Sequence, residues 1–161
     1  MKKNIRIVLL GELILCVAVF LFNIFAGGWD ISSIAWFIDV PSLLMIMLIL
    51  IPGLLIIGEM RDFLKAFSVG IQHFGLLELK NINEAVEAAQ KLTIYGALFA
   101  IIISGILLLG RLDTPSTIGP NLAVCFLSGF YAVILEFFLL PLRLNVQRKM
   151  NEEMDFDDEE S

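Results

Sequence analysis

The chain has 161 residues, of which 58% are hydrophobic and only 17% are charged. A soluble domain of this length usually has about half apolar and about a quarter charged residues, so the composition argues against an ordinary soluble protein. The formal net charge is −6, but seven of the 17 acidic residues lie in the last ten positions. The rest of the chain is close to neutral and carries no basic patch, which argues against a nucleic-acid partner.

Four stretches are long and apolar enough to cross a bilayer, which takes about 20 helical residues. They cover residues 7–25, 41–58, 92–109 and 118–142. Basic residues before the first stretch are typical of a signal peptide, but its apolar run is longer than the usual core of about 7–15 residues. This length favours a retained span. The sequence therefore predicts an all-α membrane protein with four transmembrane helices in the lipid bilayer.

Lysine and arginine residues indicate which segments face the cytoplasm. Ten of the 11 belong to three segments. Two predicted spans separate each of these segments from the next, so all three lie on the same side of the membrane. These segments are residues 1–6, 59–91 and 143–161. The two outer loops, residues 27–40 and 110–117, contain one basic residue, Arg111. Because basic residues are retained in the cytoplasm, we expect both the N-terminus and the C-terminus there.

The cytoplasmic segment 59–91 is expected to be helical and too short for a core of its own. Residues 61–74 mix apolar and charged side chains, as in a helix that lies along a membrane surface. Asn81 with Glu84 three residues later is typical of a helix start, and apolar residues follow at helical spacing. We expect the third helix to begin there in the cytoplasm and to run unbroken into the bilayer.

Two other segments are expected to depart from straight, ordered helix. Pro52, followed by Gly53, interrupts the apolar run of the second span and predicts a kink. The acidic tail in residues 143–161 carries its charge between Glu152 and Glu160. Such a run of like charges favours a disordered, solvated end.

Enzymatic chemistry finds no support in the sequence, which lacks a Gly-rich phosphate loop and a nucleophile motif. His73 is the only histidine, and no cluster of metal-ligating residues surrounds it. Cys16 and Cys125 lie in apolar runs, where a small packed residue is more common than a disulfide or a metal ligand. We therefore expect no enzyme activity, no cofactor and no metal.

The third and fourth spans each carry a stripe of small and polar residues on one helical face. The stripes are Thr93, Gly96, Ala97, Ala100, Ser104 and Gly105 in the third span, and Asn121, Cys125, Ser128, Gly129, Ala132 and Glu136 in the fourth. Small residues let helices in lipid approach closely. The same faces are also suited to lining an ion path, and both interpretations stay open.

Two acids lie within the spans. Glu136 stands about a turn and a half before Pro141, where a carboxyl at membrane depth is costly and commonly functional. Alternatively, Glu136 lies near the cytoplasmic boundary and pairs with Arg143 or another base. Glu12 follows the basic N-terminus within about two turns, and we interpret it as interfacial or paired.

Two motifs resemble MotA-type flagellar stator subunits. Residues 113–120 and the following span are similar to the loop and last span of these proteins, and residues 37–43 are similar to the approach to their second span. The residues that carry the first motif are Asp113, Pro115, Ser116, Gly119, Pro120, Tyr131 and Pro141. Together with hydropathy, the resemblance covers most of residues 1–150.

The resemblance implies the MotA/TolQ/ExbB proton-channel family in the inner (plasma) membrane of a bacterium. Its members form homo-oligomeric rings, typically pentamers, around the single spans of a partner such as MotB, TolR or ExbD. It also implies that the third and fourth spans line the ring and that ion flow past an acid on the partner drives a motor. The leading interpretation is an ion-channel or energy-transducing subunit.

The chain departs from the family pattern in two respects. The family usually has a threonine in each of its last two spans, and the matching positions hold Ile101 and Gly129. The cytoplasmic insertion of MotA is missing, and only 33 residues stand at 59–91. The candidate ion-path residues are therefore Ile101, Ser104, Ser128, Gly129 and Glu136. A non-conducting scaffold or assembly subunit, and an independent transporter with Glu136 as proton carrier, are the alternative interpretations.

The predicted orientation is tested by chemical labelling of lysine. A membrane-impermeant amine reagent should leave Lys65 unmodified in intact cells and modify it after the cells are permeabilised. Modification of Lys65 from outside an intact cell would contradict the orientation, as would recovery of the unmodified chain from the soluble fraction without detergent.

Overall fold

The computed structural model describes residues 5–28, 30–69, 71–110, 112 and 115–159, and these residues form helices and turns without strands. The elements are α1 (Ile5–Ala26), the 3₁₀ helix η1 (Ile31–Phe37), α2 (Val40–Ile57), α3 (Met60–Ala66), α4 (Leu76–Leu109) and α5 (Pro115–Glu159). Among them α1, α2, α4 and α5 are long and apolar enough to cross a membrane. The predicted all-α class and the four candidate spans are therefore confirmed.

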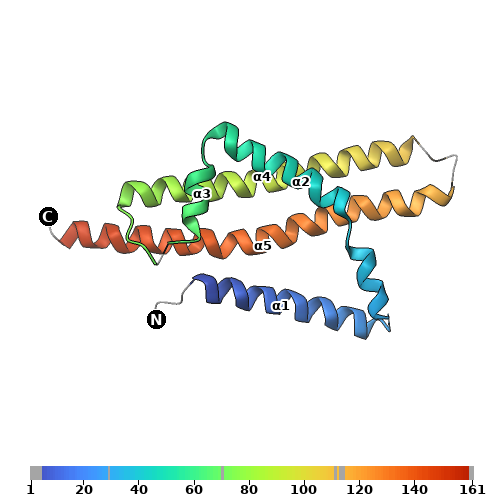
Figure 1. The fold of residues 1–161 in the computed structure, drawn as a ribbon, viewed down its shortest axis with the longest axis horizontal. Helices are drawn as coiled ribbons and strands as arrows, with labels where there is room; N and C mark the ends of the chain where they lie inside the picture. Colours follow the sequence, from blue (N-terminus) through green and yellow to red (C-terminus); the bar gives the residue numbers. More distant parts are fainter. Residues whose placement is uncertain (1–4, 29, 70, 111, 113–114, 160–161) are drawn as a thin grey trace.

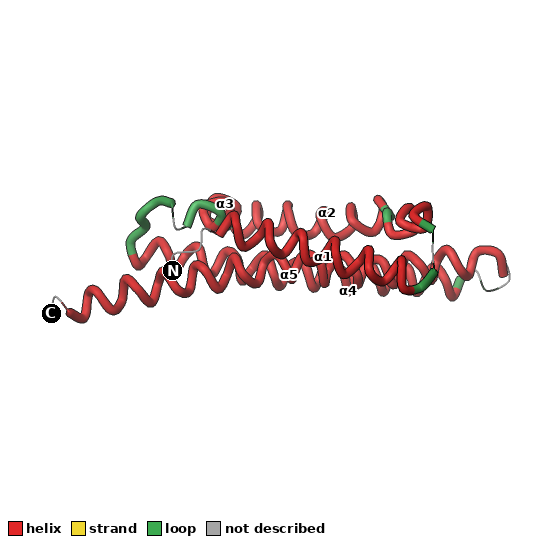
Figure 2. The backbone as a smooth tube through the Cα atoms, turned by 90° about the horizontal axis from the view of Figure 1, so that it is seen from below, coloured by secondary structure: helices red, strands yellow, loops and turns green. Residues whose placement is uncertain are grey.

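The four long helices run up and down along one common direction (Figures 1 and 2). The helices α4 and α5 form an antiparallel pair, α2 packs on both of them, and α1 lies along α5. The start of α1 and the end of α5 point toward the same end of the bundle, where α3 also lies (Figure 1).

Local chemistry fixes both ends of α2. The Asp39 side chain caps its first turn by accepting a hydrogen bond from the Ser42 backbone N–H at 3.0 Å. Pro41 sits in that first turn, where its missing N–H costs nothing. At the other end Gly58 adopts φ 88° and donates its N–H to the Leu54 carbonyl oxygen at 3.1 Å, which closes the helix.

The start predicted for the third helix at Asn81 is wrong. The helix α4 begins at Leu76, with Gly75 as its N-cap in extended conformation, and runs unbroken for 34 residues to Leu109. Leu79, which precedes Asn81, is 2% exposed. Its burial carries the apolar stripe a turn further toward the N-terminus, so tertiary packing overrides the local capping pattern.

The end of the chain differs from the expected disorder, because α5 continues as helix to Glu159. Val146 is fully buried and Met150 packs against the core, so the helix stays anchored well beyond the predicted span. At its other end α5 begins at Pro115, three residues before the predicted boundary at 118. Proline at a first helical position is favourable, which explains the earlier start.

A buried apolar cluster holds the end of the bundle at which α3 lies. It joins the first residue of α1, the second half of α2, α3 with the turn after it, the start of α4 and the second half of α5. Its members are Ile5, Leu50, Leu54, Ala66, Val69, Leu79, Ile82, Val86, Ala89, Leu139, Leu142 and Val146. The helix α1 is otherwise mostly exposed, as expected for a helix that faces lipid.

The described basic side chains belong to this half of the bundle. They are Arg61, Lys65, Lys80, Lys91, Arg143, Arg148 and Lys149. The Lys65 ammonium lies 2.9 Å from Asp62 and 3.0 Å from Glu78, which ties α3 to α4. Hydrogen bonds to these two carboxylates raise the pKa of Lys65, so it is charged at physiological pH.

The small-residue stripe of α4 lets α2 approach closely. A Cβ atom placed on Gly96 would lie 3.2 Å from the Cα and 3.3 Å from the carbonyl oxygen of Ile46, both backbone atoms of α2. Ile46 is itself fully buried and packs between Ala97 of α4 and Ala132 of α5. The structure thus uses these small residues for packing within the chain.

Pro52 and Gly53, which interrupt the apolar run of α2, lie where α2 packs against α4. Pro52 lies inside α2 without ending it, and the kink predicted there stays a prediction. A Cβ atom on Gly53 would lie 2.8 Å from Cδ2 of Leu92 in α4. Glycine at this position therefore makes room for the Leu92 side chain.

The contact at Gly96 predicts a position-specific loss of stability. Gly96→Leu should destabilise the folded chain by about 1–3 kcal/mol, because the added side chain has to displace the α2 backbone. The measurement is unfolding in detergent micelles. Gly105→Leu is the matched control, since a Cβ there meets nothing within 4 Å. Equal effects of the two substitutions would contradict the predicted contact.

Candidate functional site

A chain of polar side chains joins α4 and α5 (the α4–α5 polar chain: Lys91, Glu87, Arg143, Gln90 and Glu136). Gln90 donates from Nε2 to Oε2 of Glu136 at 3.0 Å and accepts at Oε1 from Nη1 of Arg143 at 3.2 Å. Nη2 of Arg143 lies 2.7 Å from Oε2 of Glu87. Oε1 of Glu87 in turn lies 2.8 Å from Nζ of Lys91. Donors and acceptors therefore alternate along the chain.

Helical spacing places these residues face to face. Glu87, Gln90 and Lys91 stand at positions i, i+3 and i+4 of α4 and so share one face of that helix. Glu136 and Arg143 are seven residues apart on α5, which is about two turns, and also share a face. Only Glu136 was predicted as a site residue. The polar triplet at i, i+3 and i+4, just before the apolar run, is the signal that would have revealed the α4 side.

Glu136 contacts a neutral residue where one alternative predicted a base, and its depth in the membrane stays a prediction. It is half-buried and hydrogen-bonds to the neutral amide of Gln90, while Arg143 pairs with Glu87. Among the described residues, Oε1 of Glu136 and Nε of Arg143 are buried without a hydrogen-bond partner. An unsatisfied buried polar atom costs about 1–3 kcal/mol.

Toward the opposite end of α5 the structure brings the two motifs that carry the family resemblance into contact. The Tyr131 hydroxyl donates to the carbonyl oxygen of Phe37 at 2.6 Å and accepts from the backbone N–H of Asp39 at 2.7 Å. These residues are more than 90 positions apart in the sequence. The two hydrogen bonds fix the approach to α2 against α5.

Two buried serines meet on one carbonyl group beside this contact. The Ser128 hydroxyl donates to the Val124 carbonyl oxygen at 2.9 Å, and the Ser42 hydroxyl lies 3.3 Å from the same oxygen. The Ser42 hydroxyl also forms a short hydrogen bond with the Asp39 carboxylate. Ser128 is fully buried and Ser42 is 1% exposed, so both hydroxyls serve contacts within the bundle.

The two positions that match the family threonines face each other. A Cβ atom on Gly129 of α5 would lie 3.8 Å from Cδ1 of Ile101 of α4, an ordinary van der Waals distance. The Cys125 thiol lies 3.9 Å from the Ile101 carbonyl oxygen, which adds a weak contact between the same helices. Ser104 is partly buried about one turn further along α4. Apolar atoms of Ile101 therefore face Gly129 between the two helices.

The remaining predicted residues are not members of the α4–α5 polar chain. Pro115, Ser116, Gly119 and Pro120 form the first turns of α5, and Pro141 lies inside it. Asp113 and Thr114 lie outside the described residues. One carboxyl oxygen of Glu12, Oε2, is buried without a hydrogen-bond partner in the described part of the chain. Lys2 and Lys3 of the basic N-terminus fall outside it, so whether Glu12 is paired or interfacial stays a prediction.

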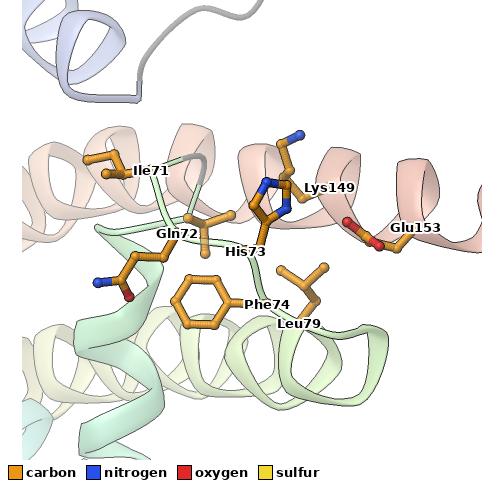
Figure 3. Close-up of a pocket in the computed structure, with 8 residues that line it drawn as sticks. Ile71, Gln72, His73, Phe74, Leu79, Lys149 and Glu153 are labelled. Carbon is orange, nitrogen blue, oxygen red and sulfur yellow. The ribbon is translucent and has the colours of Figure 1, made fainter.

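Two cavities lie outside the α4–α5 polar chain. A small one of about 60 Å³ lies at the turn after α3, and His73, Lys149 and Glu153 are among the residues that line it (Figure 3). The His73 side chain is exposed there. A larger cavity of about 820 Å³ separates α1 and η1 from α5 and is lined almost entirely by apolar side chains. Phe20 and Phe130 are among them.

No protein-family model matches the sequence, and comparison with curated proteins and with solved structures finds no match. The family resemblance therefore depends on the sequence motifs alone.

The contact of Tyr131 with Phe37 and Asp39 predicts a stability loss for Tyr131→Phe. Removal of the hydroxyl leaves two backbone groups without their partner, and each lost hydrogen bond costs about 0.5–1.5 kcal/mol. The free energy of unfolding of the variant, measured in detergent, should be lower than that of the wild type by about 1–3 kcal/mol. Tyr95→Phe is the control, because Tyr95 is 61% exposed. An unchanged stability of Tyr131→Phe would rule out the contact.

Proposed function

We propose that this chain is the multi-span subunit of an oligomeric, proton-driven channel or motor complex of the MotA/TolQ/ExbB type, working with a single-span partner. The observation that carries the proposal is the contact between the two resembling segments, in which Tyr131 bonds to Phe37 and Asp39. Residues that are far apart in the chain and resemble one family also meet in space.

The shape of the bundle supports this proposal. The long antiparallel helices α4 and α5 are the pair that would line the interior of a ring. The basic side chains gather in the half of the bundle that contains α3, which supports a cytoplasmic location for that half and for both chain ends. The bacterial inner membrane and the pentameric state belong to the same proposal and follow from the resemblance.

The α4–α5 polar chain supplies a proton-binding group for this function. Glu136 has one carboxyl oxygen on Gln90 and one buried oxygen with no partner among the described residues. A half-buried carboxyl on the helix pair that would line the ring is suited to passing a proton at the edge of the apolar layer. In the proposed complex Glu136 takes up or releases the proton that passes along α4 and α5.

A non-conducting scaffold is the second candidate, and one observation favours it. The side chain of Ile101 faces Gly129 at the level where the family has threonines, and the Ser128 hydroxyl is bound to its own helix. If this apolar level closes the path, the chain keeps the fold and assembles its partner without ion flow.

Proton flux into reconstituted vesicles separates the candidates. Vesicles that hold this chain together with the single-span protein that copurifies with it should take up protons. Glu136→Gln should lower the uptake to that of vesicles without protein, and Ser104→Ala with Ser128→Ala should reduce it. Absence of flux with the partner present would favour the scaffold. Flux without any partner would instead indicate an independent transporter.

A further inference from the structure

The orientation of the Gln90 side chain follows from its neighbour. A guanidinium group only donates hydrogen bonds, whereas a glutamine amide has one accepting oxygen and one donating nitrogen. Because Nη1 of Arg143 lies 3.2 Å from the amide of Gln90, the amide oxygen has to face Arg143. The amide nitrogen is then left to donate to Glu136. Arg143 therefore determines which end of Gln90 meets Glu136.

Arg143 forms its ion pair with Glu87 of α4. Its Nη2 pairs with Glu87 at 2.7 Å, and Glu87 also holds Lys91 at 2.8 Å. Arg143 and Glu87 are only 31% and 34% exposed, so this pair is partly screened from water. The guanidinium is thus held by Glu87, and the group that hydrogen-bonds to Glu136 is a neutral donor.

A neutral donor has a property that a cation lacks. An ion pair with arginine favours the carboxylate and resists protonation, because charge-assisted bonds are the stronger ones. An amide N–H bonds most strongly to a carboxylate oxygen, but it also bonds to the carbonyl oxygen of a neutral carboxylic acid, so the hydrogen bond survives protonation. The contact between α4 and α5 at Glu136 is therefore compatible with both forms of the acid.

We propose that Gln90 is a positioning residue which separates Glu136 from Arg143 and offers its carboxyl one neutral hydrogen bond, with the amide orientation imposed by Arg143. A proton can then bind to or leave Glu136 without breaking the helix contact. The inference rests on the proposed function only where it takes Glu136 to be the proton-binding group. The arrangement of the three side chains stands by itself.

Infrared difference spectroscopy of the purified chain tests this arrangement. The difference between the wild type and Glu136→Gln identifies the stretching band of the Glu136 carboxyl group. Gln90→Met keeps the length of the side chain and removes the donor, so this band should move in the direction of a lost hydrogen bond. Asn83→Leu is the matched control, because it also removes an amide from α4 and lies outside the polar chain. It should leave the band in place.

The role of Arg143 is tested by a double-mutant cycle. Arg143→Gln alone should move the Glu136 band, since the Gln90 amide is then free to turn. In the Gln90→Met background the same substitution should add little, because Arg143 acts through Gln90. A full additional shift in that background would mean that Arg143 acts directly on Glu136. An unchanged band in Gln90→Met would mean that the amide does not face Glu136. Either result overturns the proposal.

Folding and function are kept apart in this design. Melting in detergent checks that each variant is folded. If Gln90→Met is not folded, Gln90→Leu replaces it, because it also lacks the donor and should give the same band shift. The spectra require no ion flow. Expected band shifts without flux in vesicles would refute the proposed function alone, and flux without band shifts would refute the positioning role alone.

Discussion

The antiparallel contact between α4 and α5 is the interaction on which the other features depend. In its middle, small residues such as Gly96 and Ala132 admit Ile46 of α2, so three helices share one seam. Toward one end the seam becomes polar, with Gln90 against Glu136. In lipid the hydrophobic effect does not favour contact between apolar helix faces, because lipid tails are as apolar as the side chains. Close packing and hydrogen bonds therefore stabilise such a seam.

Much of this fold was predictable because bilayer thickness imposes a length on every apolar run. The four spans follow from that constraint alone. The errors occurred where burial, which a sequence does not display, outweighs local patterns. Leu79 is buried and moves the start of α4 ahead of the capping pattern at Asn81, and Val146 anchors a tail whose charge suggested disorder.

The candidate site was predicted less completely, because side chains on two helices have to be matched in register. Glu136 was recognisable as an acid in an apolar run. Its neighbour Gln90 was not, since a glutamine near the end of a span is unremarkable until the partner helix is placed beside it. The opposition of Ile101 and Gly129 also required the register between α4 and α5, although each position had been marked separately by resemblance.

Because α4 is unbroken, its rise per residue gives the depth of each of its residues relative to the end of the helix. At 1.5 Å per residue, Gln90 lies about 29 Å along the helix axis from its last residue, Leu109. That distance is close to the thickness of the hydrocarbon layer, about 30 Å. If the turn after Leu109 marks one water boundary, the amide and the acid that it holds mark the other. A proton that reaches Glu136 from the side of Leu109 would then have crossed the full thickness of the hydrocarbon layer.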